Sequence, residues 1–320
     1  MELRIDGQIV VPKARESLRS MIQRLGLESA ALSNRPLAAK IAGEVFTLNY
    51  IPVRNKDLAD ERISIRRAME ASKGEIRLLR YADEAGKEAY IRTAQFVIFL
   101  ALRQLWPEAV AKMNCTLGSS VYIEVTGAKD FSASRLKARI GELIAEDFPL
   151  VRRRVPLKTA RERYLASGQT DKARLLDWRT ADYFDEYYYG DFADYYYGEM
   201  MPSTGYLSVW DVVAADGGFV FVYPEDDNPD VCPRVPIMPN FFSVYSEGER
   251  WCQLMECETV ADLNDLTTSG RIRELIRVNE ALHEKRYSKV ADMVCQRGAK
   301  AVMLAGPSSS GKTTSANRLA

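Results

Sequence analysis

The sequence predicts an α+β chain of several domains, because three patterns follow one another along its 320 residues. Short segments of alternating apolar and polar residues, typical of strands, dominate the first 80 residues. Apolar residues at helical spacing then recur between residues 93 and 148. From residue 300 onward, a short apolar segment leads into a loop rich in glycine and serine, as at the start of an α/β domain.

Composition excludes several classes of protein. The best apolar run, residues 96–102, is far shorter than the roughly 18 residues that a membrane helix needs. The N-terminus has no signal-peptide core, and five cysteines without a CxxC pair are typical of reduced thiols. We therefore expect a cytoplasmic protein that makes no membrane contact. Because His283 is the single histidine, the sequence argues against a histidine-rich zinc site and a Ser-His-Asp triad.

The first 80 residues predict a small β-grasp module, since the order of their elements is strand, helix and paired strands. The expected elements are a hairpin at residues 3–11 with Asp6-Gly7 as its turn, a helix at 17–25, paired strands at 38–51 around Ala42-Gly43, and a strand at 76–81.

The remaining chain predicts alternating helical and β-rich regions. The expected elements are a buried apolar helix at 93–112, a strand at 121–125, a helix at 132–148 capped by Ser132, a basic helical stretch to about 179, a β-rich region with a strand at 241–245, and helices at 260–266 and 271–297. Five prolines between residues 224 and 239 predict a long extended loop. His283 falls within the last helix, where we expect a surface or packing role.

Charge is distributed unevenly, although the net charge is zero. Residues 1–179 carry 32 basic and 22 acidic side chains, whereas residues 180–249 carry 14 acidic side chains and one basic. The basic side chains are densest in one stretch, which contains Arg152, Arg153, Arg154, Lys158, Arg161, Arg163, Lys172, Arg174 and Arg179. One interpretation of this stretch is a contact surface for RNA phosphates. The other is a helical face that is either solvated or docked on the acidic segment. The scarcity of aromatic residues among these side chains favours the second interpretation.

Residues 183–206 contain eight tyrosines, for which two interpretations apply: Tyr183, Tyr187, Tyr188, Tyr189, Tyr195, Tyr196, Tyr197 and Tyr206. Bases of single-stranded nucleic acid stack on such rings. The acidic side chains among these tyrosines would repel phosphates, however. We therefore expect a packed, tyrosine-rich interface.

The most specific motif is Gly306-Pro307-Ser308-Ser309-Ser310-Gly311-Lys312-Thr313, which matches G-x-x-x-x-G-K-[ST]. Residues 300–305 predict a buried parallel strand before it, and residues 315–319 predict a helix after it, as a P-loop requires. The two glycines allow backbone amides to surround a β-phosphate, which the helix N-terminus also favours. Lys312 would be the catalytic residue that reaches the β- and γ-phosphates, and the Thr313 hydroxyl would ligate Mg²⁺. Further donors would come from Thr314 and the three serines, so the expected cofactors are ATP and Mg²⁺.

The sequence ends at Ala320, in the first turns after this loop. Because a P-loop fold needs several more β-α units, we expect these residues to be the front part of a longer protein. The catalytic acid and the acceptor site would then lie beyond Ala320, and the fragment alone is expected to be inactive.

Several segments resemble one family. Residues 305–314 (AGPSSSGKTT), preceded by residues 279–285 (NEALHEK), are similar to a junction in bacterial uridine kinase-like nucleoside kinases. Residues 201–207 (MPSTGYL) and 260–264 (VADLN) match the same family. Its members carry an N-terminal extension that resembles threonyl-tRNA synthetase, with a TGS domain of β-grasp fold and a second additional domain. A P-loop kinase domain of the uridine kinase/phosphoribulokinase type follows this extension.

The resemblance implies a TGS-like domain at residues 1–80, a synthetase-like α+β domain at 81–250, connecting helices at 251–298 and the start of a P-loop kinase domain at 299–320. It implies transfer of the ATP γ-phosphate to a hydroxyl group of a nucleoside or a similar small acceptor. The basic N-terminal region would be available for RNA contact. The alternative is an RNA- or ribosome-associated P-loop ATPase that uses the TGS domain as an RNA-binding module.

One departure from the family concerns the synthetase editing domain, which hydrolyses mischarged tRNA with a His-x-x-x-His pair. Arg92-Thr93-Ala94-Gln95-Phe96 occupies that place here, so both histidines are missing. The resemblance therefore argues against hydrolytic editing, and it favours a scaffold, regulatory or RNA-contact role for this domain.

Overall fold

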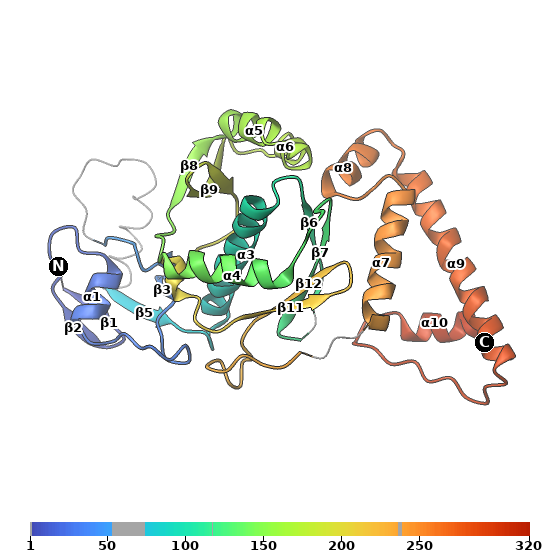
Figure 1. Ribbon diagram of the computed structural model, residues 1–320, viewed down its shortest axis with the longest axis horizontal. Coiled ribbons are helices and arrows are strands. Elements are labelled where there is room, and N and C mark those ends of the chain that lie inside the picture. The colour runs from blue at the N-terminus through green and yellow to red at the C-terminus, as the bar shows by residue number, and fades with distance from the viewer. Residues whose placement is uncertain (1, 53–73, 117, 236–238) are drawn as a thin grey trace. The chain divides into compact units, whose positions relative to one another are not determined.

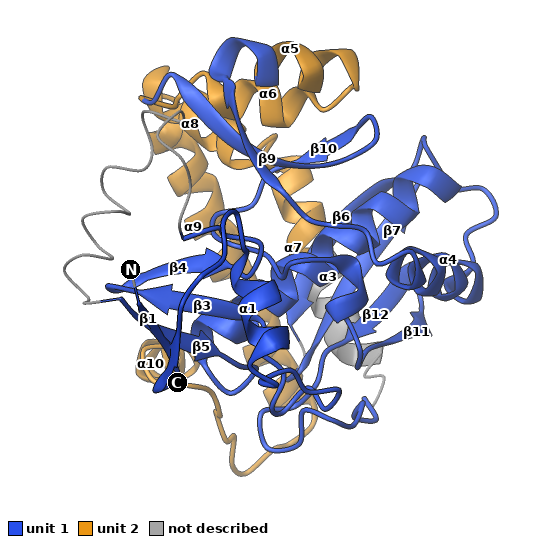
Figure 2. Ribbon diagram, turned by 90° about the vertical axis from the view of Figure 1, so that its left-hand side faces the viewer, with its two compact units in different colours: residues 1–160, 181–242 blue, residues 161–180, 243–320 orange. Residues whose placement is uncertain are grey.

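A computed structural model describes residues 2–52, 74–116, 118–235 and 239–320. The chain forms two compact units, drawn in blue and orange in Figure 2. Unit 1 comprises residues 1–160 and 181–242, and unit 2 comprises residues 161–180 and 243–320. The mixture of sheets and helices, labelled in Figure 1, confirms the predicted α+β class. The finer division at residues 80, 250 and 298 stays a prediction.

The N-terminal part of unit 1 is a five-stranded sheet with the order β2-β1-β5-β3-β4. Its strands are β1 (Leu3–Ile5), β2 (Gln8–Val10), β3 (Ala38–Ile41), β4 (Glu44–Thr47) and β5 (Glu75–Leu79). Strand β1 runs parallel to β5, and the other neighbours are antiparallel. Helix α1 (Leu18–Arg24) begins after Ser17, whose hydroxyl accepts the Ser20 N–H at 3.2 Å. These are the elements that the sequence predicts for a β-grasp module.

Both hairpin turns of this sheet use left-handed backbone conformations. The φ angles are 44° at Asp6 and 85° at Gly7, and they are 49° at Ala42 and 93° at Gly43. Two-residue turns with positive φ at both positions match the twist of the flanking strands. Turn chemistry therefore sets the register of both hairpins.

The rest of unit 1 contains two further sheets and two long helices. The elements are α3 (Glu84–Leu105), β6 (Val110–Thr116), β7 (Ser120–Thr126), α4 (Ala133–Ala145), β8 (Arg152–Pro156), β9 (Tyr183–Tyr189), β10 (Phe192–Asp194), a 3-10 turn η1 (Thr204–Tyr206), β11 (Asp211–Ala215) and β12 (Gly218–Val222). The sheet orders are β11-β12-β7-β6 and β10-β9-β8. One hydrophobic core extends from Leu3 in the first sheet to Tyr223 after β12, so the first sheet shares its interior with the rest of unit 1.

The MPSTGYL segment, residues 201–207, contacts α1 and the loops around the first sheet. The Asn49 amide donates to the Pro202 carbonyl at 2.7 Å. The Tyr206 ring lies 4.0 Å from the Arg35 guanidinium carbon and 5.1 Å from that of Arg19. These contacts give the segment a structural role within unit 1.

Unit 2 is helical. Helix α5 (Leu157–Ala166) enters it from unit 1, and the other helices are α6 (Thr170–Leu176), α7 (Pro239–Leu254), α8 (Val260–Thr268), α9 (Ile272–Gln296) and α10 (Lys312–Leu319). His283 is exposed on α9, and its ring meets that of Trp251 edge to face at 6.1 Å between centroids. The predicted surface or packing role of His283 is confirmed.

Three predicted elements before residue 300 differ from the structure. Helix α3 begins nine residues before the predicted start at residue 93, because its first turns are amphipathic and not continuously apolar. It also ends at Leu105, so the predicted helix end at residue 112 falls within strand β6. The predicted basic helical stretch opens instead with strand β8, which pairs with β9, and the residue before Pro156 favours an extended backbone. Residues 241–245 lie within helix α7 and not in a strand; α7 begins at Pro239, and proline is favoured in the first turn of a helix.

Two glycines in helices allow a matched test of packing in unit 1. A Cβ atom on Gly86, near the start of α3, would lie 2.1 Å from the Arg80 carbonyl oxygen, whereas one on Gly141 in α4 would meet no atom within 4 Å. We expect Gly86→Ala to lower the free energy of unfolding by about 1–3 kcal/mol. Gly141→Ala is expected to raise it by about 0.5–1 kcal/mol. Urea unfolding of both variants would check this, and equal effects would contradict the geometry.

Candidate functional site

The nucleotide-binding motif forms an exposed loop that leads into helix α10. Gly311 is the N-cap residue of α10, with φ at +75°, and Ser309 has φ at +62°. A Cβ atom on Gly306 would lie 2.8 Å from the Ser310 hydroxyl oxygen, so a larger residue there would require that hydroxyl to rotate away. Left-handed residues in a short loop turn successive backbone amides toward one concave side, which suits an anion.

Lys312 and Thr313 of the motif, followed by Thr314, open helix α10. The Lys312 ammonium donates to the Pro307 carbonyl, across the loop from its own backbone. Thr313 and Thr314 are exposed in the first turn of α10. The residue types and the loop conformation fit the phosphates of ATP with Mg²⁺, and the roles predicted for residues 306–314 stay predictions.

Helix α9 holds the helix of this loop within unit 2. The Tyr287 and Ser315 hydroxyls are hydrogen bonded at 3.1 Å, and Arg318 forms an ion pair with Glu284. Glu284 belongs to the NEALHEK segment. Through Glu284, this segment contacts α10, the helix that follows the loop.

The strand predicted at residues 300–305 is absent. These residues are exposed and have no regular secondary structure; Met303 is 95% exposed. A buried parallel strand requires neighbouring strands on its edges. In the part of the chain that the structure describes, no sheet includes a residue beyond Val222, so nothing pairs with this segment.

The basic stretch of residues 152–179 is largely paired with acidic side chains. In unit 1, Arg154 binds the Asp185 carboxylate with two nitrogens, at 3.0 and 3.1 Å. Arg152 lies 3.1 Å from Glu199, whose pKa is raised by burial although Arg152 opposes the shift. Arginines whose charge is neutralised by a neighbouring carboxylate offer little net charge to an RNA backbone. The interpretation that this stretch docks on the acidic segment is confirmed for these pairs.

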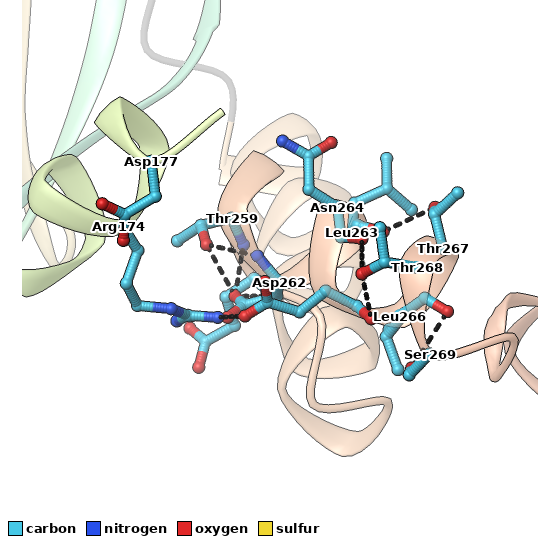
Figure 3. A network of polar contacts seen from close by, with 12 residues as sticks. Arg174, Asp177, Thr259, Asp262, Leu263, Asn264, Leu266, Thr267, Thr268 and Ser269 are labelled. Carbon is cyan, nitrogen blue, oxygen red and sulfur yellow. Dashed lines mark hydrogen bonds and ion pairs between the residues drawn. The ribbon is translucent and has the colours of Figure 1, made fainter. Parts of the chain in front are cut away.

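The same neutralisation occurs within unit 2, as Figure 3 shows around Arg174. Arg174 donates to Asp262 at 2.8 Å and to Asp265 at 2.5 Å, both on α8. Thr259 and Asp262 form a capping box at the start of α8. The VADLN segment is therefore a capped helix start that also holds the α6 arginine.

This network predicts that the stability of unit 2 depends on pH. Burial raises the pKa of Asp262, but hydrogen bonds from Thr259 and Arg174 outweigh it and hold the pKa below its usual value. The stability that Asp262 contributes is therefore complete above the unfolded pKa of about 3.9 and is lost as the pH falls through the lower folded pKa. We expect Asp262→Asn to lower the free energy of unfolding by about 1 kcal/mol at pH 7.

The difference between Asp262→Asn and the natural chain should shrink as the pH falls below about 4. Urea unfolding at several pH values would measure it. Asp292→Asn on the exposed side of α9 is the matched control, since it removes a carboxylate without this network. A difference that stays constant down to pH 2.5 would contradict the assignment.

Most of the tyrosines between residues 183 and 206 pack in unit 1. Tyr187 is buried, and the Tyr196 ring contacts that of Phe96 at 6.3 Å between centroids. The Tyr183 ring lies 3.7 Å from the Arg154 guanidinium carbon. Tyr197 differs, with 73% of its surface exposed. The expected packed interface is confirmed for the buried rings.

A shallow, open surface pocket of about 390 Å³ lies in unit 1 beside this cluster, lined by Glu88, Ile91, Arg92, Gln95, Tyr195, Tyr196 and Tyr197. Arg92 donates to Glu88 at 2.6 Å. A Cβ atom on Gly198 would lie 2.7 Å from the Arg92 guanidinium carbon. The sequence analysis named the Arg92 position but not this pocket, because the two segments that line it are about 100 residues apart in the sequence. Among its lining residues there is neither histidine nor cysteine. Over the described ranges, no group of three or more histidine, cysteine, aspartate or glutamate side chains could hold a metal ion.

No helix in the described part of the chain is both long enough and apolar enough to cross a membrane.

Comparison with known proteins finds relatives among tRNA ligases. The chain is 25% identical to the threonine–tRNA ligase of Halorhodospira halophila over 202 residues, which is 62% of this chain and 30% of the ligase. It is 24% identical to that of Clostridium kluyveri over 256 residues, 79% of this chain and 36% of the ligase. No protein-family model matches the sequence. The matched stretch therefore spans about a third of the length of these relatives.

These relatives support the synthetase-like part of the resemblance and overturn the kinase part. The expected function, phosphorylation of a nucleoside by a uridine kinase-type enzyme, is wrong on this comparison, because the matching proteins are named as ligases that act on tRNA. A nucleoside acceptor has no support either. What the relatives favour is the alternative, an RNA-associated protein.

Proposed function

We propose that this protein is an RNA-associated, nucleotide-binding protein whose N-terminal region recognises tRNA. The similarity to threonine–tRNA ligases carries this proposal, because a stretch of 79% of the chain must include most of unit 1. Proteins of that name join an amino acid to tRNA, which supports a tRNA contact for the shared region. Since that region is about a third of the ligases' length, the proposal concerns tRNA binding and not aminoacylation.

The second part of the proposal assigns nucleotide binding to residues 306–314. When bound, ATP with Mg²⁺ supplies a polyphosphate and a hard cation. The Lys312 ammonium would exchange the Pro307 carbonyl for a phosphate oxygen, and the Thr313 hydroxyl would become a metal ligand. The exposure of the loop supports this, because a triphosphate can approach it from solvent. In this proposal, nucleotide occupancy modulates RNA binding.

The test is the affinity of the full chain for tRNA as a function of potassium chloride concentration. Direct phosphate contacts give a linear fall of log affinity with log salt, and the slope counts those contacts. We expect tighter binding to tRNA than to a single-stranded homopolymer of the same length. Equal affinity for both, or no binding at low salt, would contradict the proposal.

Two neighbouring arginines of strand β8 allow a test of where the proposed tRNA contact lies. Arg153 has no carboxylate partner among the described residues, whereas Arg154 is held by Asp185. If strand β8 touches RNA, Arg153→Ala should reduce the salt slope by about one, and Arg154→Ala should change it less. Unchanged slopes in both variants would place the tRNA contact elsewhere on unit 1.

A further inference from the structure

The end of helix α7 brings two cysteines of unit 2 together. The Cys257 N–H donates to the Cys252 carbonyl at 3.0 Å, and the Glu256 N–H donates to the Gln253 carbonyl at 3.0 Å. Glu256 lies in the left-handed region, with φ at +51°. This combination of a 6→1 bond, a 5→2 bond and a left-handed residue is a Schellman motif.

A Schellman motif usually places an apolar contact between the residues at the two ends of its 6→1 bond. Here both of those residues are cysteines. Bond lengths and the 3.0 Å hydrogen bond limit the separation of their Cα atoms to less than about 7 Å. Disulfides join cysteines whose Cα atoms lie about 4.4–6.8 Å apart, so the backbone already holds this pair near bonding range.

The surroundings of the two thiols keep them accessible. Both are half-buried and free, whereas Cys115 is buried and Cys295 is exposed. The pKa of Cys257 is raised by burial and, in addition, by the charges of Asp262 and Cys252. The Cys252 thiol is therefore near enough to Cys257 to contribute to that shift.

We propose that Cys252 and Cys257 form a redox-active dithiol, whose oxidant is a low-molecular-weight disulfide of the glutathione class. One thiolate attacks a sulfur atom of the oxidant, forms a mixed disulfide and releases one thiol. The second thiolate attacks the protein sulfur of that mixed disulfide, so the Cys252–Cys257 bond forms and a second thiol leaves. The protein loses two protons and two electrons, and the oxidant is reduced to two thiols.

Oxidation would fix the connection between α7 and α8. The disulfide would close a loop of six residues that ends two positions before Thr259, the cap of α8. A closed loop restricts the unfolded chain, so the oxidised protein should unfold at a higher temperature. This inference does not depend on the proposed nucleotide or RNA binding.

The sequence offers a direct readout of this bond. Trypsin cleaves after Arg250 and Arg271, and the peptide between them contains Cys252, Cys257 and no other cysteine, lysine or arginine. The full chain would be equilibrated in buffers of varied ratios of reduced to oxidised glutathione, alkylated and digested. We expect this peptide to lack both alkyl groups and to be two hydrogen atoms lighter than the dithiol as the buffer becomes oxidising.

Single substitutions separate the pair from ordinary thiol reactivity. Cys252→Ser and Cys257→Ser should each leave a stable glutathione adduct on the remaining cysteine. Cys115→Ser and Cys295→Ser are the matched controls, and both should retain the internal disulfide. The proposal would be overturned if peptide 251–271 stayed doubly alkylated or carried glutathione at every ratio. A bond from either cysteine to another peptide or to a second chain would overturn it too.

Discussion

Replacing Lys312 by alanine is expected to weaken the binding of MgATP to this protein by roughly 10- to 100-fold. The ammonium group lies across the loop at the Pro307 carbonyl, where it can transfer its hydrogen bond to a phosphate oxygen. Hydrogen bonds to charged groups contribute about 1.5–3 kcal/mol, which corresponds to this loss of affinity. A titration with a fluorescent ATP analogue would measure the dissociation constant.

Two further variants make this test specific to the loop. Lys300→Ala removes a charge from an exposed position outside the motif, and it should leave the affinity nearly unchanged. Thr313→Val keeps the shape of the side chain but removes the hydroxyl, so ATP binding should lose its dependence on Mg²⁺. If Lys300→Ala and Lys312→Ala weakened binding equally, the attraction would be nonspecific and the assignment of this loop would be wrong.

The largest effect on stability is expected for Phe96→Ala, which should lower the free energy of unfolding of unit 1 by about 3–5 kcal/mol. Phe96 has no exposed surface, and its ring meets those of Phe192 at 5.3 Å and Tyr196 at 6.3 Å between centroids. Truncation would leave a cavity between α3 and the tyrosine-rich segment. Unfolding in urea, followed by tyrosine and tryptophan fluorescence, would measure the change.

An exposed aromatic residue of the same region provides the control. Tyr197→Ala removes a ring that is 73% exposed, and the expected change is below about 0.5 kcal/mol. Comparable losses for both variants would contradict the burial of Phe96. A histidine in place of Phe96 would place a polar ring in this buried core.

Local chemistry was predictable from sequence, whereas pairings between distant segments were not. The turn at Asp6-Gly7 and the cap at Ser132 were predicted correctly, because each depends on a few consecutive residues. Strand β8 was mistaken for a helix, since its strand character depends on pairing with β9 about 30 residues later. The short apolar run at 241–245 was wrongly predicted to be a strand, because such runs suit a helix and a strand equally.

For the candidate sites too, features formed by consecutive residues were predictable and contacts between distant residues were not. The loop at residues 306–313 was predictable because its residues are contiguous. The sequence favoured a basic stretch that is solvated or docked on the acidic segment 180–249. The carboxylates that neutralise Arg174 lie 88 and 91 positions away and outside that segment, so these partners could not be named. The dithiol was missed because Cys252 and Cys257 have no recognised spacing; only the hydrogen bonds of the helix end bring them together.

The place of the three consecutive arginines has a consequence for solubility. They lie on β8, which has a strand neighbour on one side only in the described sheet β10-β9-β8. A strand with one open edge can pair with the edge of another molecule and start aggregation, and charged side chains on that strand oppose such stacking. The three arginines therefore oppose edge-to-edge pairing of β8 with another molecule. At high protein concentration, variants that remove these charges should precipitate before they lose their fold.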